Sequence, residues 1–222
     1  MKALFTAFLS IFLLVHTAEA RFVIIKVNCS ETDARLFSNG NFVGIGSAEI
    51  TIQYPGKVLI EAKKTGYITA ETTIYYDNKH SKPDEKQAYM LTMVRDDAWD
   101  ASVTSDQANR DVEIKTSKTE DEAWRLISEI VTSAFDIIET SDKDAGYMRT
   151  SWAVQNFNYN TVRTRVIIKS AGTEPLKYKI KIVSEDSGQA QTSVKDDEKF
   201  KTWDRILKKY SGLIEELQTR LR

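Results

Sequence analysis

Residues 176 to 185 read LKYKIKIVSE, and this stretch decides the expected fold of the C-terminal half of the chain. Tyr178, Ile180 and Ile182 alternate with three lysines, which is the period of a β-strand that buries one face and exposes the other. The stretch TVRTRVIIKSAG, at residues 161 to 172, alternates in the same way. We expect the two strands to lie side by side, with one face toward a core and one basic face.

Two helices are expected in the same half of the chain. Thr119 is followed three residues later by Glu122, which is the spacing of a capping box, and the apolar residues that follow recur on one helical face. From Phe200 to Leu221, apolar residues repeat in alternating steps of three and four, which predicts one long helix. Gly212 weakens that helix by about 1 kcal/mol relative to alanine. Packing on the module's own sheet is therefore favoured over oligomerisation through this stripe.

Residues 21 to 95 read as short strands separated by turns, because they are rich in β-branched and aromatic residues and no helix of useful length fits there. Asn39-Gly40 predicts a tight hairpin turn, and Pro55-Gly56 predicts a type II turn. These glycines are expected to serve backbone geometry and not to hold a phosphate. The segment is therefore predicted to form a small all-β sandwich.

This segment also resembles a PEGA domain, over about residues 22 to 94. The pattern of that family is a strand, a turn with glycine, a second glycine, a Pro-Gly turn, a strand and a closing Gly-Tyr. The matching positions are Gly40, Gly44, Pro55, Gly56, Gly66 and Tyr67. The resemblance implies a β-sandwich without catalytic residues that acts as a binding or surface-layer module.

Residues 96 to 111, DDAWDASVTSDQANRD, differ in character from both halves. They hold five aspartates against one arginine, and they lack the apolar density of a core. We expect an acidic linker here, followed by a second domain at residues 112 to 222. Trp99 is expected to pack against one of the two domains instead of acting as an exposed anchor for a partner.

The order of strand, helix, strands and helix over about residues 110 to 221 resembles the helix-grip domains of the lipoprotein C subunit of the bacterial outer-membrane β-barrel assembly machinery. The matching features are Trp124, Asp136-Ile137-Ile138, Asp142, Asp144 and Gly146-Tyr147. The resemblance implies an α+β domain in which a curved antiparallel sheet grips a long helix and leaves a groove. The fold class expected for the whole chain is multidomain, with an all-β sandwich before this helix-grip domain.

Residues 1 to 20 have the pattern of a secretory signal peptide. Lys2 precedes an apolar run, and Ala18 and Ala20 form a small-x-small cleavage signal, so the mature chain is predicted to begin at Arg21. The apolar run is shorter than the roughly 20 residues of a membrane-spanning helix. This pattern predicts an exported protein, in the periplasm or associated with the outer membrane or cell surface.

The composition offers little for catalysis. A formal net charge of −1 gives no overall attraction to nucleic acid or anionic membrane. Beyond the predicted signal peptide, His80 is the one histidine, in a polar loop, and no metal-ligand cluster, phosphate loop or nucleophile elbow is found. We expect no catalytic residues, no cofactor and no metal, and hence a protein that is not an enzyme.

One surface remains as a candidate for binding. Its residues alternate along the two strands described first: Arg163, Arg165, Lys169, Lys177, Lys179 and Lys181. Such a face suits acidic lipid headgroups, lipopolysaccharide or an acidic protein, or it only keeps the solvent face soluble. Aromatic residues for stacking bases are not interleaved, which argues against nucleic acid.

These patterns together predict a non-enzymatic bacterial cell-envelope protein that binds a protein or an envelope polymer as an adaptor. The alternative is a protein that binds a small apolar or lipidic ligand in the helix-grip groove.

Overall fold

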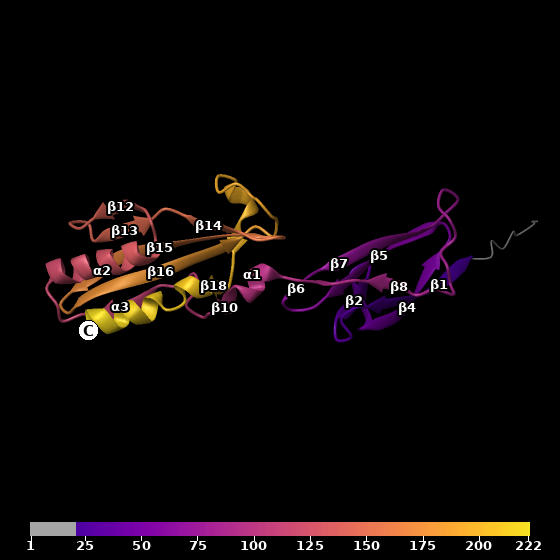
Figure 1. Cartoon of the computed structure of the whole chain (residues 1–222), viewed down its shortest axis with the longest axis horizontal. Coiled ribbons are helices and arrows are strands. Elements are labelled where there is room, and N and C mark those ends of the chain that lie inside the picture. Colours follow the sequence, from indigo (N-terminus) through magenta and orange to yellow (C-terminus); the bar gives the residue numbers. More distant parts are fainter. Residues whose placement is uncertain (1–20) are drawn as a thin grey trace, which may run out of the picture. The chain divides into compact units, whose positions relative to one another are not determined.

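The computed structural model describes residues 21 to 222, so the predicted signal peptide with Ala18 and Ala20 lies outside the described residues. Arg21, the expected start of the mature chain, is exposed. The described residues divide into two compact units, the first of residues 21–64 with 69–93 and the second of residues 65–68 with 94–222. The architecture is mixed α+β, with mostly antiparallel strands and few helices (Figure 1).

The first unit is built from seven strands in the order β7-β5-β2-β3-β4-β1-β8. They are β1 Phe22–Cys29, β2 Arg35–Ser38, β3 Asn41–Ile45, β4 Ser47–Gln53, β5 Gly56–Lys63, β7 Ala70–Tyr76 and β8 Tyr89–Leu91. Alternate residues of these strands are buried: Val23, Ile25 and Val27 on β1, with Ile50 and Ile52 on β4. The period of two therefore builds the core of this unit.

The turns of the first unit follow the sequence only in part. Asn39 and Gly40 have φ of 48° and 82°, as a tight β2–β3 hairpin requires. The type II turn predicted at Pro55-Gly56 is wrong, because the Tyr54–Pro55 peptide is cis and Gly56 lacks the positive φ of that turn. A Cβ on Gly56 would lie 2.6 Å from the carbonyl oxygen of Gln53, and one on Gly44 would lie 2.6 Å from that of Ser47. Both glycines permit close backbone approach.

The Gly66-Tyr67 pair belongs to the second unit and not to the sandwich that it was expected to close. β6, Tyr67–Ile68, pairs with β9, Val94–Arg95. Gly66 has a φ of 79°, and a Cβ there would lie 3.1 Å from Cδ1 of Trp99. The backbone pairing and the Trp99 ring together place the pair in that unit.

The acidic linker predicted at residues 96–111 is wrong in its secondary structure, because these residues are folded within the second unit. Asp96 caps α1, Asp97–Asp100, by accepting a hydrogen bond from the backbone N–H of Ala98. β10, Ser102–Thr104, then pairs with β18, Arg205–Leu207. Asn109 donates from its side chain to the carbonyl oxygen of Trp203 at 2.8 Å. Side-chain capping and non-local pairing thus replace the apolar density that the segment lacks.

Arg205 holds this segment in place. The side chain is 5% exposed and its guanidinium lies 3.5 Å from the centre of the Trp99 ring. It donates to the hydroxyls of Ser102 and Thr104, at 2.7 Å each, and to the backbone carbonyls of Trp99 and Ser102. Burial lowers the pKa of this guanidinium. Because the hydrogen bonds are distributed over α1 and β10, Arg205 fixes both elements to β18.

The second unit has a large antiparallel sheet in the order β11-β16-β15-β13-β12, with β14 paired to β15 and β17 to β16. The strands are β11 Val112–Lys115, β12 Ile138–Asp142, β13 Tyr147–Thr150, β14 Ala153–Asn156, β15 Thr161–Thr173, β16 Leu176–Asp186 and β17 Lys201–Thr202. Helices α2, Glu120–Ala134, and α3, Leu213–Leu221, lie side by side next to this sheet (Figure 1). The predicted capping box of α2 is confirmed, since Thr119 and Glu122 exchange hydrogen bonds.

The long helix predicted over Phe200–Leu221 is wrong in its first half. The chain there forms β17, then β18, the 3-10 turn η2 at Lys208–Tyr210, and only then α3. A strand forms here instead of a helix because β18 completes a hydrogen-bonded ladder with β10, and a helix cannot pair with a strand in this way. The apolar side chains of the stripe are still mostly buried, and the Tyr210 ring stacks on Phe135 at 4.5 Å. The stripe therefore packs within this chain's own core.

We predict that Arg205→Leu destabilises the second unit by about 3 kcal/mol, because it removes several charged hydrogen bonds and leaves buried acceptors unpaired. All four tryptophans, Trp99, Trp124, Trp152 and Trp203, lie in this unit, so tryptophan fluorescence during urea unfolding reports on it alone.

The control is Lys209→Leu on η2, where the lysine is exposed. This change is expected to shift the stability by no more than about 0.5 kcal/mol. An unfolding midpoint of Arg205→Leu equal to that of the wild type would contradict the role given to Arg205.

Candidate functional site

The six predicted basic residues lie on one face of the β15–β16 pair. On the other face, Ile180 and Ile182 of β16 and Val166 and Ile168 of β15 are buried in the core that also contains α2. Strand alternation therefore turns the intervening basic residues away from the helices. We call the side of the sheet that faces away from α2 the basic sheet face. It is made by Arg149, Arg163, Arg165, Lys169, Lys177, Lys179 and Lys181.

Arg163 is not available for a partner, because it is 4% exposed and fully engaged. Its Nε donates to Glu185 at 2.7 Å, and its Nη1 donates to Asp197 and to the carbonyl oxygen of Val194. The guanidinium lies 4.1 Å from the centre of the Phe200 ring. Arg163 thus anchors the segment that follows β16, and its role is structural.

Two of the predicted lysines are partly neutralised. Lys177 forms an ion pair with Glu113 of β11 at 3.2 Å, and Lys181 forms one with Asp111 at the same distance. Both lysines keep roughly a third or less of their side-chain surface exposed, and such partly solvated pairs contribute little to stability. They contribute less net positive charge to the face than the sequence pattern indicates.

Lys169 and Lys179 are exposed and opposite each other in the β15–β16 register. Neither makes an ion pair with any residue of the described range 21–222. Like charges in directly opposed positions destabilise a strand pair. Glu113 of β11, directly opposite Lys179 on its other side, offsets part of this cost, and an anionic partner would relieve the rest.

Arg149 on β13 is a member of this face that sequence reasoning missed. It pairs in register with Ile167 of β15 and forms a 3.0 Å ion pair with Glu139. The alternation of Tyr147 and Arg149 is a signal for the face they share, but only the β13–β15 pairing places Tyr147 opposite Lys169 and Arg149 diagonal to Arg165.

Arg165 is half-buried and differs from the buried arginines of this unit, Arg163 and Arg205. Its guanidinium lies 4.0 Å from the centre of the Trp152 ring, and its Nε is buried without an acceptor in the described residues. Burial, followed by the charge of Arg149, lowers the pKa of Arg165, while Glu185 and Glu139 oppose that shift. The Nε of Arg149 is likewise buried and unpaired within residues 21–222.

Other chemistry-bearing residues have structural surroundings. His80 stacks on Tyr75 at 4.3 Å and contacts Asp77 through Nδ1 at 2.8 Å, and Cys29 is buried at the end of β1. Within the described part of the chain, no group of three or more His, Cys, Asp or Glu is placed to hold a metal ion. No helix among residues 21–222 has the length and apolarity to cross a membrane.

The groove implied by the helix-grip resemblance is closely packed on the helix side. Ile127 and Ile130 of α2 are 0% exposed. A cavity between β11 and the end of α3, lined by Glu113, Ile114, Lys115, Gln218 and Arg222, has a volume of about 250 Å³. A second cavity, near Trp152, has a volume of about 90 Å³. Ligand sites usually measure roughly 300 Å³ or more.

No protein-family model and no curated protein matches the chain. The PEGA and helix-grip resemblances therefore stay predictions that rest on the residues quoted for them.

Asp186 lies at the end of β16 in a partly buried setting, opposite Val162 and on the side of the sheet away from the basic sheet face. It accepts a hydrogen bond from Nδ2 of Asn160 at 3.2 Å. Burial raises the pKa of Asp186, and the hydrogen bond from Asn160 opposes the shift. An aspartate with a raised folded-state pKa binds its proton more tightly when folded, so its ionisation reduces stability as pH rises through that range.

We predict that Asp186→Asn stabilises the second unit near pH 7, where the wild-type carboxylate is ionised at a cost. The advantage should shrink as pH falls through the raised folded-state pKa, where the folded wild type takes up its proton. It should be lost below 3.8, where the group is protonated in both the folded and the unfolded state. The difference in unfolding free energy between the variant and the wild type is measured across this pH range by urea unfolding, with tryptophan fluorescence as the signal. Asp106→Asn, at an exposed position, removes the same charge and should show no such pH-dependent gain.

Proposed function

We propose that this protein is a non-enzymatic binding module of the bacterial cell envelope and that its basic sheet face contacts an anionic protein or envelope polymer. The observation that carries the proposal is the placement of Arg149, Arg165, Lys169 and Lys179 on this one face of the sheet. Of these four, only Arg149 has a carboxylate partner in the described range, which is Glu139. The excess positive charge favours an anionic partner.

The resemblances to a PEGA domain and to a helix-grip domain support the same proposal. The run of short strands in the first unit is what a PEGA-like sandwich would have, and that family serves binding. In the second unit, α2 and α3 lie beside a long antiparallel sheet, as in a helix-grip domain. Both are proposed here as adaptor domains, and the predicted signal peptide assigns them to the periplasm or to the outer-membrane or cell-surface region.

The alternative function, binding of a small apolar ligand in a helix-grip groove, has less support. The α2 residues that meet the sheet are closed off from solvent, and the cavities near Trp152 and between β11 and α3 hold about 90 Å³ and about 250 Å³. A lipidic ligand needs a larger apolar space than that.

The proposal predicts that the double variant Lys169→Glu/Lys179→Glu loses capture of envelope partners. Tagged protein is crosslinked in cells, recovered, and the captured molecules are quantified. Reversing two charges at the centre of the face is expected to lower capture at least tenfold, and capture by the wild type should fall with rising salt.

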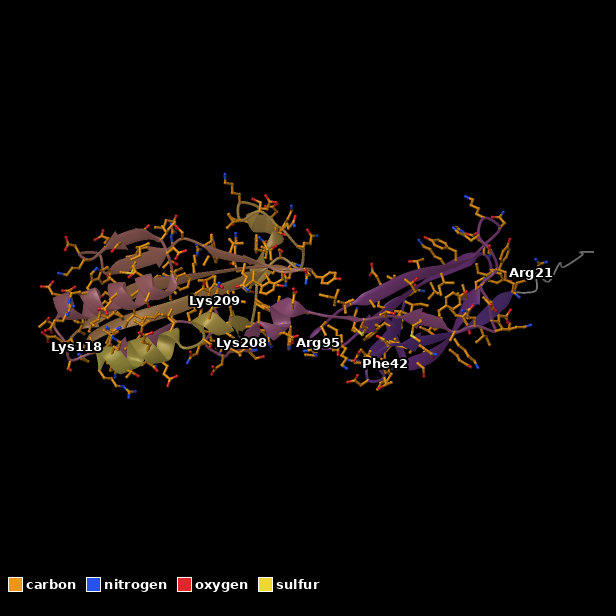
Figure 2. All side chains as sticks on the ribbon, in the orientation of Figure 1. Arg21, Phe42, Arg95, Lys118, Lys208 and Lys209 are labelled. Carbon is orange, nitrogen blue, oxygen red and sulfur yellow. The ribbon has the colours of Figure 1, made fainter. Side chains whose placement is uncertain are left out.

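The matched control is Lys208→Glu/Lys209→Glu, which makes the same change in net charge on η2, between β18 and α3 (Figure 2). This control should capture partners as the wild type does. Equal capture by Lys169→Glu/Lys179→Glu and the wild type would overturn the proposal.

A further inference from the structure

Ile167 lies at the centre of a ring of cations on the basic sheet face. It pairs in register with Arg149 of β13 on one side and with Lys181 of β16 on the other. Arg165 and Lys169 are two residues before and after it on the same strand, so alternation points them to the same face. Directly opposed side chains are roughly 5 Å apart and diagonal ones roughly 7 Å apart, so the cationic groups surround a small patch.

The arginines of this unit fall into two kinds. Arg163 and Arg205 are buried, and protein acceptors meet each of their guanidinium groups. Arg165 makes no hydrogen bond or ion pair with any residue of the described chain, although its Nε is buried. A buried donor without an acceptor is costly and calls for an external partner, such as an ion or water.

Arg149 adds a second set of donors to the same patch. One of its nitrogens, Nη2, is bonded to Glu139 at 3.0 Å, while its Nε is buried and unpaired among residues 21–222. Lys181 is held by Asp111, which leaves Arg149, Arg165 and Lys169 as the cations that face the patch with spare donors. Their combined charge exceeds that of Glu139, since the other nearby carboxylate, Glu185, is paired with Arg163.

Trp152 gives the patch rigidity. Its ring lies 4.0 Å from the guanidinium carbon of Arg165 and 4.3 Å from that of Arg163. Arg163 is itself fixed by Glu185 and Asp197, so the stack of arginine, tryptophan and arginine is anchored at one end. Stacking occupies the face of the Arg165 guanidinium and leaves its in-plane N–H donors for a ligand.

From this geometry we propose that Arg149, Arg165 and Lys169 form a binding site for a phosphoryl group above Ile167. A tetrahedral phosphoryl group offers several oxygens to donors that converge from β13 and β15, and its charge offsets the excess cations. The proposal rests on the proposed function, because it names the chemistry that the basic sheet face recognises. The phosphoryl group comes from a lipid headgroup or from free phosphate.

The test uses the chain from Arg21 to Arg222 with two probes, inorganic phosphate and vesicles of phosphatidylglycerol mixed with phosphatidylcholine. Binding is followed by calorimetry for phosphate, by vesicle sedimentation, and by the change in tryptophan fluorescence. Arg165→Gln and Arg149→Gln are each expected to weaken binding at least tenfold. Arg165→Lys keeps the charge without the fork of donors and should lie between them and the wild type.

The matched control is Lys115→Gln on β11, which removes an exposed charge that lies opposite Lys177, away from Ile167. Its binding should stay within about twofold of the wild type, since a single exposed charge at that distance is screened. Because Arg165 has no protein hydrogen bond in the described chain, Arg165→Gln should keep the wild-type unfolding midpoint, and Arg149→Gln gives an independent reading.

Binding of inorganic phosphate that is lost in both arginine variants supports the site with free phosphate as its source. Binding only to phosphatidylglycerol vesicles, lost in both variants, supports a lipid headgroup. Absence of binding to either probe, or equal binding by the variants, overturns the site. In that case the crosslinking experiment, which compares capture by Lys169→Glu/Lys179→Glu with capture by the wild type, still tests the proposed function on its own.

Discussion

The second unit depends on the pairing of β15 with β16, the longest two strands of the chain. Their register runs from Val162 opposite Asp186 to Thr173 opposite Leu176, with one irregularity near Ser170. Because successive side chains point to opposite faces, the apolar residues of this pair face α2 and its basic residues lie on the basic sheet face. A slip of one residue would exchange the two sets and bury lysines. The core and the basic sheet face are therefore two results of one constraint.

Buried arginines give this unit its irregular parts. Arg205 ties α1 and β10 to β18, and Arg163 ties the segment after β16 to the sheet. A guanidinium has five donors in a fixed plane, so it can satisfy several backbone and side-chain acceptors that regular secondary structure leaves unpaired. Arg165 has the same chemistry without such acceptors in the described chain, and this contrast is the reason for proposing it as a binding group.

The two faces of the sheet also separate two kinds of function. On the helix side, the side chains of α2, α3 and the sheet interdigitate in one core, which favours a rigid scaffold over a ligand cavity. On the basic sheet face, cations stand on adjacent strands whose backbone positions are held by that core. A rigid sheet presents charges at fixed spacing, so little conformational entropy opposes the binding of an anionic group.

Sequence alone determined what depends on neighbours along the chain. The capping box of α2, the Asn39-Gly40 turn and the alternation of β15 and β16 are local patterns, in which each residue interacts with others a few positions away or with solvent. The face shared by Arg165 and Lys169 follows from alternation along a single strand. These features could be predicted because they depend on interactions between residues that are close together in the sequence.

Only the tertiary structure decided what depends on distant partners. Residues 96–111 fold because Ser102 meets Arg205, 103 positions away, and the same pairing turns the first half of the expected C-terminal helix into β18. Arg149 and Trp152 reach Arg165 through strand order, and the Pro55-Gly56 corner follows a cis peptide. Local propensities at these places are weak, on the order of 1 kcal/mol, so non-local hydrogen bonds and burial outweigh them.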